Sequence, residues 1–99
     1  MQIIESKDGE VITLVVDGRV DTNTSPKLQE NILKSFQDAN HVVLDFKDCT
    51  YVSSAGLRVL LAGQKTAMAK KGSMKLIHVP EILMSVLKLS GFVKFLTIE

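Results

Sequence analysis

The sequence has no tryptophan, one cysteine and only two prolines in 99 residues. The lone cysteine, Cys49, excludes an internal disulfide and fits a reducing compartment. Four phenylalanines, one tyrosine and a formal net charge of +1 provide neither the stacking side chains nor the basic stripe of a nucleic-acid surface. The first residues lack the pattern of a signal peptide, and no apolar run is long enough to span a bilayer. We therefore expect a cytoplasmic protein that binds neither nucleic acid nor membrane.

The usual catalytic motifs are also missing. The chain has no Gly-Lys-Ser/Thr phosphate loop and no Gly-x-Ser-x-Gly elbow, which removes the usual groups for nucleotide hydrolysis and acyl transfer. His41 and His78 have no acidic or cysteine companions at metal-ligand spacing, so we interpret both as structural. Cys49 has no activating cation nearby in the sequence, and we interpret it as a buried thiol. The sequence predicts no catalytic residue, no metal and no cofactor, and hence no enzyme.

What the chain does have is regular apolar patterning. Apolar residues make up 45% of it, enough for the core of one small domain over 1–99. Short apolar runs predict strands at 3–5, 11–16, 41–46, 74–79 and 95–98, and helical spacing predicts helices beginning near Ser25, Ser54 and Pro80. The second strand is apolar on both faces, so we expect it to be central, and the run in the third strand is typical of a strand covered on both sides. The order β-β-α-β-α-β-α-β predicts an α/β domain whose mixed β-sheet has a leading β-hairpin and crossover helices.

Helix ends and inward faces follow from the same pattern. Ser25 before Pro26 predicts an N-cap, and Gly72 after two lysines predicts a glycine C-cap. The inward helix stripes include Leu33, Leu61, Met68 and Ile82. The expected core contains Leu14, Val16, Leu28, Ile32, Val43, Leu44, Leu57, Leu60, Leu76, Ile77, Val86 and Leu87.

Polar side chains gather where the predicted parallel strands end. The carboxyl ends of parallel strands share one edge of a sheet, and binding loops collect there. That edge is expected to hold most of the polar chemistry of the chain, namely Asp21, Asp45, Asp48, Ser53 and Ser54. Asp21 is either a surface turn residue or part of a polar site beside the serines.

Ser53 and Ser54 lie at the start of a predicted helix. A serine there can cap the helix, or it can accept a phosphate at the positive end of the helix dipole. Both interpretations can hold for the pair, with one serine capping and the other facing outward. Gly56 in the first turn costs up to about 1 kcal/mol relative to alanine. This suggests a close approach to the backbone by a partner, a neighbouring loop or the sheet.

Three short motifs together resemble a known family. They are Ser53-Ser54-Ala55-Gly56-Leu57-Arg58, Gly18-x-Val20-Asp21 before the first helix, and Leu87-x-x-Ser90-Gly91-Phe92 near the end. In this order and spacing they are similar to the STAS domain family, specifically its stand-alone bacterial members, the anti-sigma factor antagonists. The resemblance covers the whole chain and implies a STAS domain over 1–99.

The resemblance implies a phosphorylation switch. The serine two residues before the glycine is the family's phosphate acceptor, which is Ser54 here, with Ser53 as the alternative. Family members commonly carry an aspartate at the position of Ser53, and this chain departs from the family's pattern there. Asp21 matches the family's acidic residue beside the switch. The expected partner contacts are Asp21, Ser53, Ser54, Gly56 and Arg58.

The resulting hypothesis is a monomeric regulator that binds an anti-sigma factor with serine-kinase activity and releases a sigma factor. Phosphorylation would switch it off, and a serine phosphatase would restore it. One alternative is a STAS subunit of another assembly, in stress signalling or lipid transport. Another is a nucleotide-binding STAS module that uses the same edge of the sheet.

Overall fold

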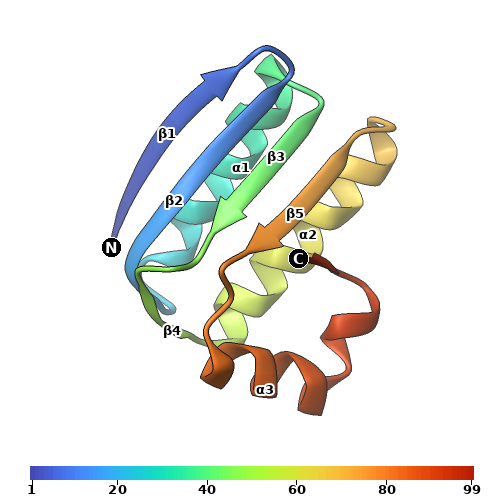
Figure 1. The fold of residues 1–99 in the computed structure, drawn as a ribbon. Coiled ribbons are helices and arrows are strands. Elements are labelled where there is room, and N and C mark those ends of the chain that lie inside the picture. Colours follow the sequence, from blue (N-terminus) through green and yellow to red (C-terminus); the bar gives the residue numbers. More distant parts are fainter.

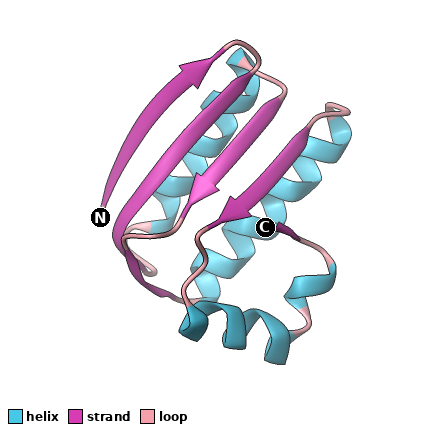
Figure 2. Ribbon diagram, viewed as in Figure 1, coloured by secondary structure: helices cyan, strands magenta, loops and turns pink.

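The computed structural model describes residues 1–99 (Figures 1 and 2). Its strands are β1 (Gln2–Asp8), β2 (Val11–Val20), β3 (His41–Asp45), β4 (Cys49–Val52), β5 (Ser73–Ile77) and β6 (Thr97–Ile98). Its helices are α1 (Ser25–Asp38), α2 (Ser54–Ala69) and α3 (Glu81–Ser90), followed by the 3-10 helix η1 (Phe92–Lys94). Every predicted strand and helix is present, β1 and β2 are longer than predicted, β6 is shorter, and β4 is additional.

The strands form one mixed sheet. Its order is β1-β2-β3-β5-β6, and β4 pairs with the end of β2. β1 runs antiparallel to β2, whereas the other pairs are parallel. Since parallel neighbours need a crossover, α1, α2 and α3 each connect one strand to a parallel one. The predicted fold class is confirmed.

The helices cover only one face of this sheet. α1 and α2 lie side by side behind it in the view of Figure 1, and α3 lies beyond the ends of the strands. The opposite face has no helix on it, and Val11, Val15 and Val43 are half-buried there. The prediction that the third strand is covered on both sides was therefore wrong, whereas β2 is an interior strand of the sheet, as predicted. Neighbouring strands shield β-branched side chains from the sides, so such runs also suit a sheet with one open face.

The core fills the space between the sheet and the helices α1 and α2. Leu14, Leu28, Leu44 and Leu60 are all completely buried there. Of the predicted core, Val43 and Ile77 are half-buried and Val86 is exposed, and the rest is buried. Three other residues predicted to face inward are also exposed: Leu33, Met68 and Ile82. Their apolar stripes are wider than the surface that a neighbouring element covers. No helix is long and apolar enough to cross a bilayer.

The longer β2 and the additional β4 belong to one feature. β2 pairs with β3 up to Val15 and with β4 from Gly18 onward, and the register with β4 shifts between Gly18 and Arg19. Gly18 has φ +102°, which a residue with a side chain rarely adopts. β4 was missed in the sequence because only Cys49 and Val52 of its residues are buried. This extension carries the strand ends to the start of α2.

Gly72 is not the left-handed C-cap that the sequence predicted. The left-handed residue after α2 is Lys71, with φ +59°, and the N–H of Gly72 donates to the carbonyl of Ala67 at 2.8 Å. This is a Schellman ending with lysine in the usual glycine position. Gly72 is required for another reason, because a Cβ there would overlap the carbonyl oxygen of Asn40.

Candidate functional site

The first turn of α2 gives its two serines different surroundings. Ser53 is the N-cap, in extended conformation, and its Oγ accepts a hydrogen bond from the N–H of Gly56 at 3.2 Å. Ser53 is half-buried, whereas Ser54 is the first residue of the helix and is exposed. The hydroxyl of Ser54 has no hydrogen-bond partner within the chain. Of the two possibilities that the sequence left open, capping is carried out by Ser53 and outward presentation by Ser54.

Contacts with β2 and β4 fix the start of α2. The N–H of Ser53 donates to the carbonyl of Val20 at 2.8 Å, where β2 ends. Gly56 is buried, and a Cβ on it would lie 2.7 Å from Cγ1 of Val52 and 2.8 Å from Cγ1 of Val20. Real Cβ atoms do not approach carbon this closely, so the helix can rest on the strands only with glycine here. The close approach inferred from Gly56 is therefore internal packing, and it gives no separate evidence for a partner.

Asp21 organises the turn between β2 and α1. Its Oδ1 accepts hydrogen bonds from the backbone N–H groups of Thr24 and Asn23, both at 3.0 Å. The bond from the Thr24 N–H is the main reason that the pKa of Asp21 is lowered from its ordinary value. Its carbonyl accepts from the N–H of Ser25 at 2.8 Å. Asp21 is thus a half-buried, ionised turn residue beside the end of β2.

Ser25 is not the N-cap of α1, contrary to the sequence prediction. The cap position is Thr24, and Ser25 is the buried first residue of the helix. The Thr24 hydroxyl accepts from the N–H of Asp21 at 2.8 Å instead of capping the helix. Asp21 and Thr24 therefore satisfy each other's backbone groups, an arrangement in which side-chain bonds replace the usual cap.

Two arginines lie near the start of α2. Arg58 is exposed on the helix, one turn after Ser54, and it also lines a groove of about 340 Å³ between α1 and α2. Neither arginine belongs to an ion pair within the chain. Arg19 on β2 stacks over the ring of Tyr51 on β4 at 4.4 Å from the ring centre. No sequence pattern predicted this stacked pair, because it depends on β4.

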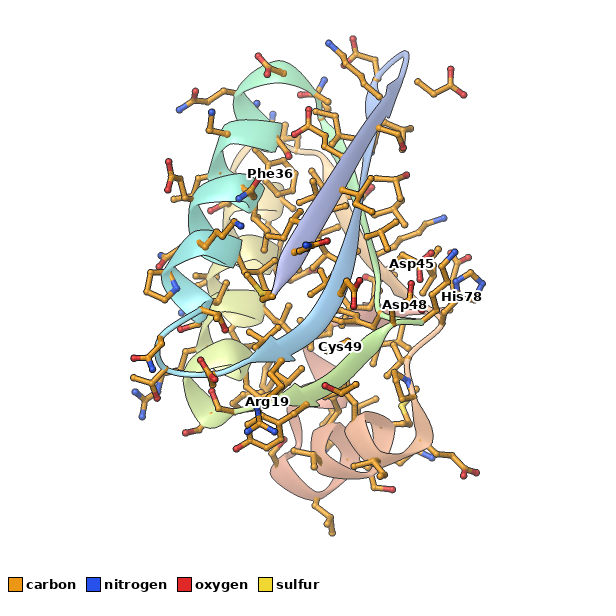
Figure 3. The ribbon with its side chains drawn as sticks, turned by 90° about the vertical axis from the view of Figure 1, so that its left-hand side faces the viewer. Arg19, Phe36, Asp45, Asp48, Cys49 and His78 are labelled. Atoms are coloured by element: carbon orange, nitrogen blue, oxygen red, sulfur yellow. The ribbon has the colours of Figure 1, made fainter.

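Asp45 and Asp48 lie away from the serines. Figure 3 places both of them, with His78, on the side of the sheet opposite α1. Nδ1 of His78 lies 3.0 Å from Oδ1 of the buried Asp45. Burial alone would raise the pKa of Asp45, but hydrogen bonds from the N–H of Lys47 and from His78 outweigh it, so this pKa is lowered. The predicted single edge is therefore two clusters, and the side-chain contact between Asp45 and His78 was not predicted, because the sequence does not show how side chains are oriented where two strands end.

Cys49 is buried where β4 begins, as the sequence predicted. Burial raises the pKa of its thiol, which keeps it protonated and unreactive at neutral pH. Beside it, the side chains of β4 and α3 line a cavity of about 340 Å³ that is mostly apolar. No three side chains of His, Cys, Asp or Glu lie close enough together to hold a metal ion.

The site built around α2 is suited to recognition. It presents a free hydroxyl at a helix start, where backbone N–H groups and the helix dipole favour a negative charge. Ser54 has no neighbouring base that would activate it as a nucleophile, as its unbonded hydroxyl shows. Ser53, Ser54, Arg58 and the Asp21 turn lie at or near this start, and we call these residues the α2 rim. The rim can contact a partner protein or accept a phosphate.

This chain is similar to known proteins of one family. A family model described as Mlab, STAS domain matches residues 3–97. The chain is 26% identical over 98 residues to an anti-sigma-B factor antagonist of Listeria monocytogenes, covering 97% of this chain and 85% of that protein.

Solved structures share the fold. An anti-sigma factor antagonist from Mycobacterium paratuberculosis matches with a TM-score of 0.86 and 20% identity, over 98% of this chain and 83% of that one. The phosphorylated form of SpoIIAA, a Bacillus cell fate determinant, matches with a TM-score of 0.77 and 16% identity, over 99% and 91%. With the family model spanning nearly all residues, the chain belongs to the STAS domain family.

Proposed function

We propose that this protein is an anti-sigma factor antagonist that binds an anti-sigma factor through the α2 rim. The observation that carries this proposal is the free, exposed hydroxyl of Ser54 in the first turn of a helix whose cap is supplied by Ser53. The Listeria relative is named as an anti-sigma-B factor antagonist. The Mycobacterium structure of the same fold is described as an anti-sigma factor antagonist. Binding would release the sigma factor held by the anti-sigma factor.

The rim offers the partner both shape and charge. Arg58 lies four residues after Ser54, so both side chains are on the same face of α2. A guanidinium that is not engaged within the chain can bind a carboxylate of the partner in bidentate fashion. Asp21 and Ser53 lie where β2 and β4 end and frame this face. The backbone at Gly56 is buried beneath the face, and its direct contact with a partner stays a prediction.

Phosphorylation of Ser54 by the partner kinase would switch this binding off. A phosphate adds about −1.5 to −2 charge at neutral pH. At a helix start this charge is locally favourable, so the fold should persist. SpoIIAA has been solved in an unphosphorylated and in a phosphorylated form, which match this chain with TM-scores of 0.78 and 0.77. The cost of burying an unpaired dianion in the interface, several kcal/mol, would lower the affinity by orders of magnitude.

The protein would act in the cytoplasm by binding and not by catalysis, and a serine phosphatase would remove the phosphate. Ser54 is exposed and does not cap the helix, which would allow a phosphatase to reach the modified residue as easily as a kinase reaches the free one.

Charge reversal on one face of α2 tests the binding surface. The anti-sigma factor is isolated from the source organism on immobilised Ser54→Ala protein and identified as a kinase by mass spectrometry. Arg58→Glu is expected to weaken its binding by about tenfold or more, measured by calorimetry. Lys65→Glu, about two turns further along the same helix, is the matched control and should leave the affinity unchanged. Equal losses in both variants would place the interface elsewhere.

A further inference from the structure

The outer edge of β1 is free. β1 is the first strand of the sheet, it pairs along its whole length with β2, and no strand pairs with its other side. In Figure 3 it is the element nearest the viewer, and neither a helix nor a loop crosses in front of it. Most of its residues are exposed, including Ile4 at 59%. A long edge of this kind is a template for another strand.

The hairpin fixes which backbone groups face outward. Gly9 and Glu10 form a two-residue turn, and Asp8 is paired with Val11 at its base. In a two-residue hairpin this closing pair is hydrogen-bonded, and bonded pairs then alternate along the strands. The even-numbered residues of β1 therefore bond to β2. Ile3, Glu5 and Lys7 point their N–H and C=O groups away from the sheet.

The charges on this edge favour pairing with one particular strand. Glu5 and Lys7 have opposite charges, are both exposed, and lie two residues apart on the same face. Neither takes part in an ion pair within the chain. If a second copy of β1 pairs antiparallel with Ser6 on the two-fold axis, Glu5 lies opposite the partner's Lys7, and Lys7 lies opposite the partner's Glu5. Both residues belong to the set with outward backbone groups, so the same register also forms backbone hydrogen bonds.

Other registers lack this match. Centring the pair on Glu5 sets Glu5 against the partner's Glu5, and centring it on Lys7 sets two lysines together, which is unfavourable. Charged residues often protect an edge strand against pairing. Here the charges protect it against most strands but complement a second copy in one register.

We propose that β1 is a homodimer interface, in which it pairs antiparallel with β1 of a second copy around Ser6 and joins the two sheets. This would replace the monomer expected from the sequence. The inference does not depend on the proposed function, since α1 lies between α2 and this edge in Figure 1. Each copy would keep its α2 rim free, and the two rims would point in opposite directions because the two copies of β1 are antiparallel.

A charge-swap series tests the pairing. Self-association of the full chain is measured by sedimentation velocity over a concentration series, with circular dichroism to confirm the fold. Glu5→Lys alone and Lys7→Glu alone should each weaken self-association by about tenfold, since like charges then meet twice. The double variant should recover it. An equimolar mixture of the two single variants should form a heterodimer, because each supplies the charge that the other needs.

Cross-linking tests the register independently. Residues on the axis form a non-hydrogen-bonded pair with Cα atoms about 4.5 Å apart, within the range of a disulfide. Ser6→Cys should therefore give a covalent dimer on mild oxidation, whereas Asp8→Cys on the same face should not. Cys49 is buried and does not interfere. A wild-type protein that stays monomeric at all concentrations, or single variants that associate as well as wild type, would overturn the proposal.

Discussion

Ser53 and Ser54 are neighbours, but their hydroxyls differ in what they can do without cost to the fold. Oγ of Ser53 is used by the N–H of Gly56, and the side chain is half-buried. A phosphate on Ser53 would disturb this cap and would have to fit next to the ends of β2 and β4. A phosphate on Ser54 would enter solvent beside the same helix dipole. The geometry therefore favours Ser54 as the position that can be modified in the folded protein.

Removing each serine hydroxyl in turn tests whether Ser53 caps the helix and Ser54 does not. Ser53→Ala should lower the free energy of unfolding by about 0.5–2 kcal/mol, because the N–H of Gly56 loses its acceptor. Ser54→Ala should change it by less than about 0.5 kcal/mol, since the hydroxyl has no partner to lose. Urea denaturation of both variants measures the difference. A larger loss for Ser54→Ala than for Ser53→Ala would reverse the assignment of the cap.

Asp45 should make stability depend on pH. Its pKa is lowered in the folded protein, so its carboxylate stabilises the fold above the unfolded pKa of about 3.9. This contribution is lost as the pH falls through that value toward the lower pKa of the folded state. Asp45→Asn should therefore be less stable than wild type at pH 7, with the difference shrinking below about pH 4. Denaturation at several pH values checks this, and parallel curves for the two proteins would contradict it.

Among the elements, α2 can take its position on the strands only because Gly56 in its first turn has no side chain. Gly56 lets the helix start lie directly on Val20 and Val52, and the hydrogen bond from Ser53 to Val20 holds it there. The cap and the close packing together set the direction in which Ser54 points.

Alanine at the two glycines of α2 tests this contact. Both substitutions gain up to about 1 kcal/mol of helix propensity. Gly56→Ala would press on branched side chains of two strands, and overpacking of that kind costs about 1–3 kcal/mol. Gly63→Ala would meet mainly the flexible end of Met74, at 2.8 Å from its Sδ, and should cost less. Thermal unfolding of both variants ranks them, and an equal or greater loss for Gly63→Ala would show that α2 is not fixed at Gly56.

The sequence predicted those elements whose local signals agreed. The start of α2 was found because capping residues precede an apolar helical stripe, and the paired Ser53 and Ser54 marked the site. β4 was not predicted because its exposed residues Thr50 and Tyr51 interrupt the apolar run. Some helix residues were wrongly predicted to face the core, such as Ile82 on α3, and this error has a different cause. Periodicity shows which side of an element is apolar, whereas the covering of that side depends on tertiary packing that no local pattern contains.

At the scale of the molecule, the fold separates its surfaces. The α2 rim lies where β2 and β4 end, the Asp45–His78 pair lies on the side opposite α1, and the β1 edge borders the sheet (Figures 1 and 3). α1 and α2 bury the core on one face only, which leaves these surfaces open to different contacts. A partner at the rim would thus bind without competing for the β1 edge.

Phosphosite mapping by mass spectrometry, combined with a partner-binding assay, tests most directly whether Ser54 is the switch. Wild type, Ser53→Ala and Ser54→Ala are each incubated with the isolated anti-sigma factor kinase and Mg-ATP. We predict phosphate on Ser54 in wild type and in Ser53→Ala, none in Ser54→Ala, and a phosphorylated protein that keeps its circular dichroism spectrum but no longer binds the kinase. Phosphate found only on Ser53, or unchanged binding after phosphorylation of Ser54, would show that Ser54 is not the switch.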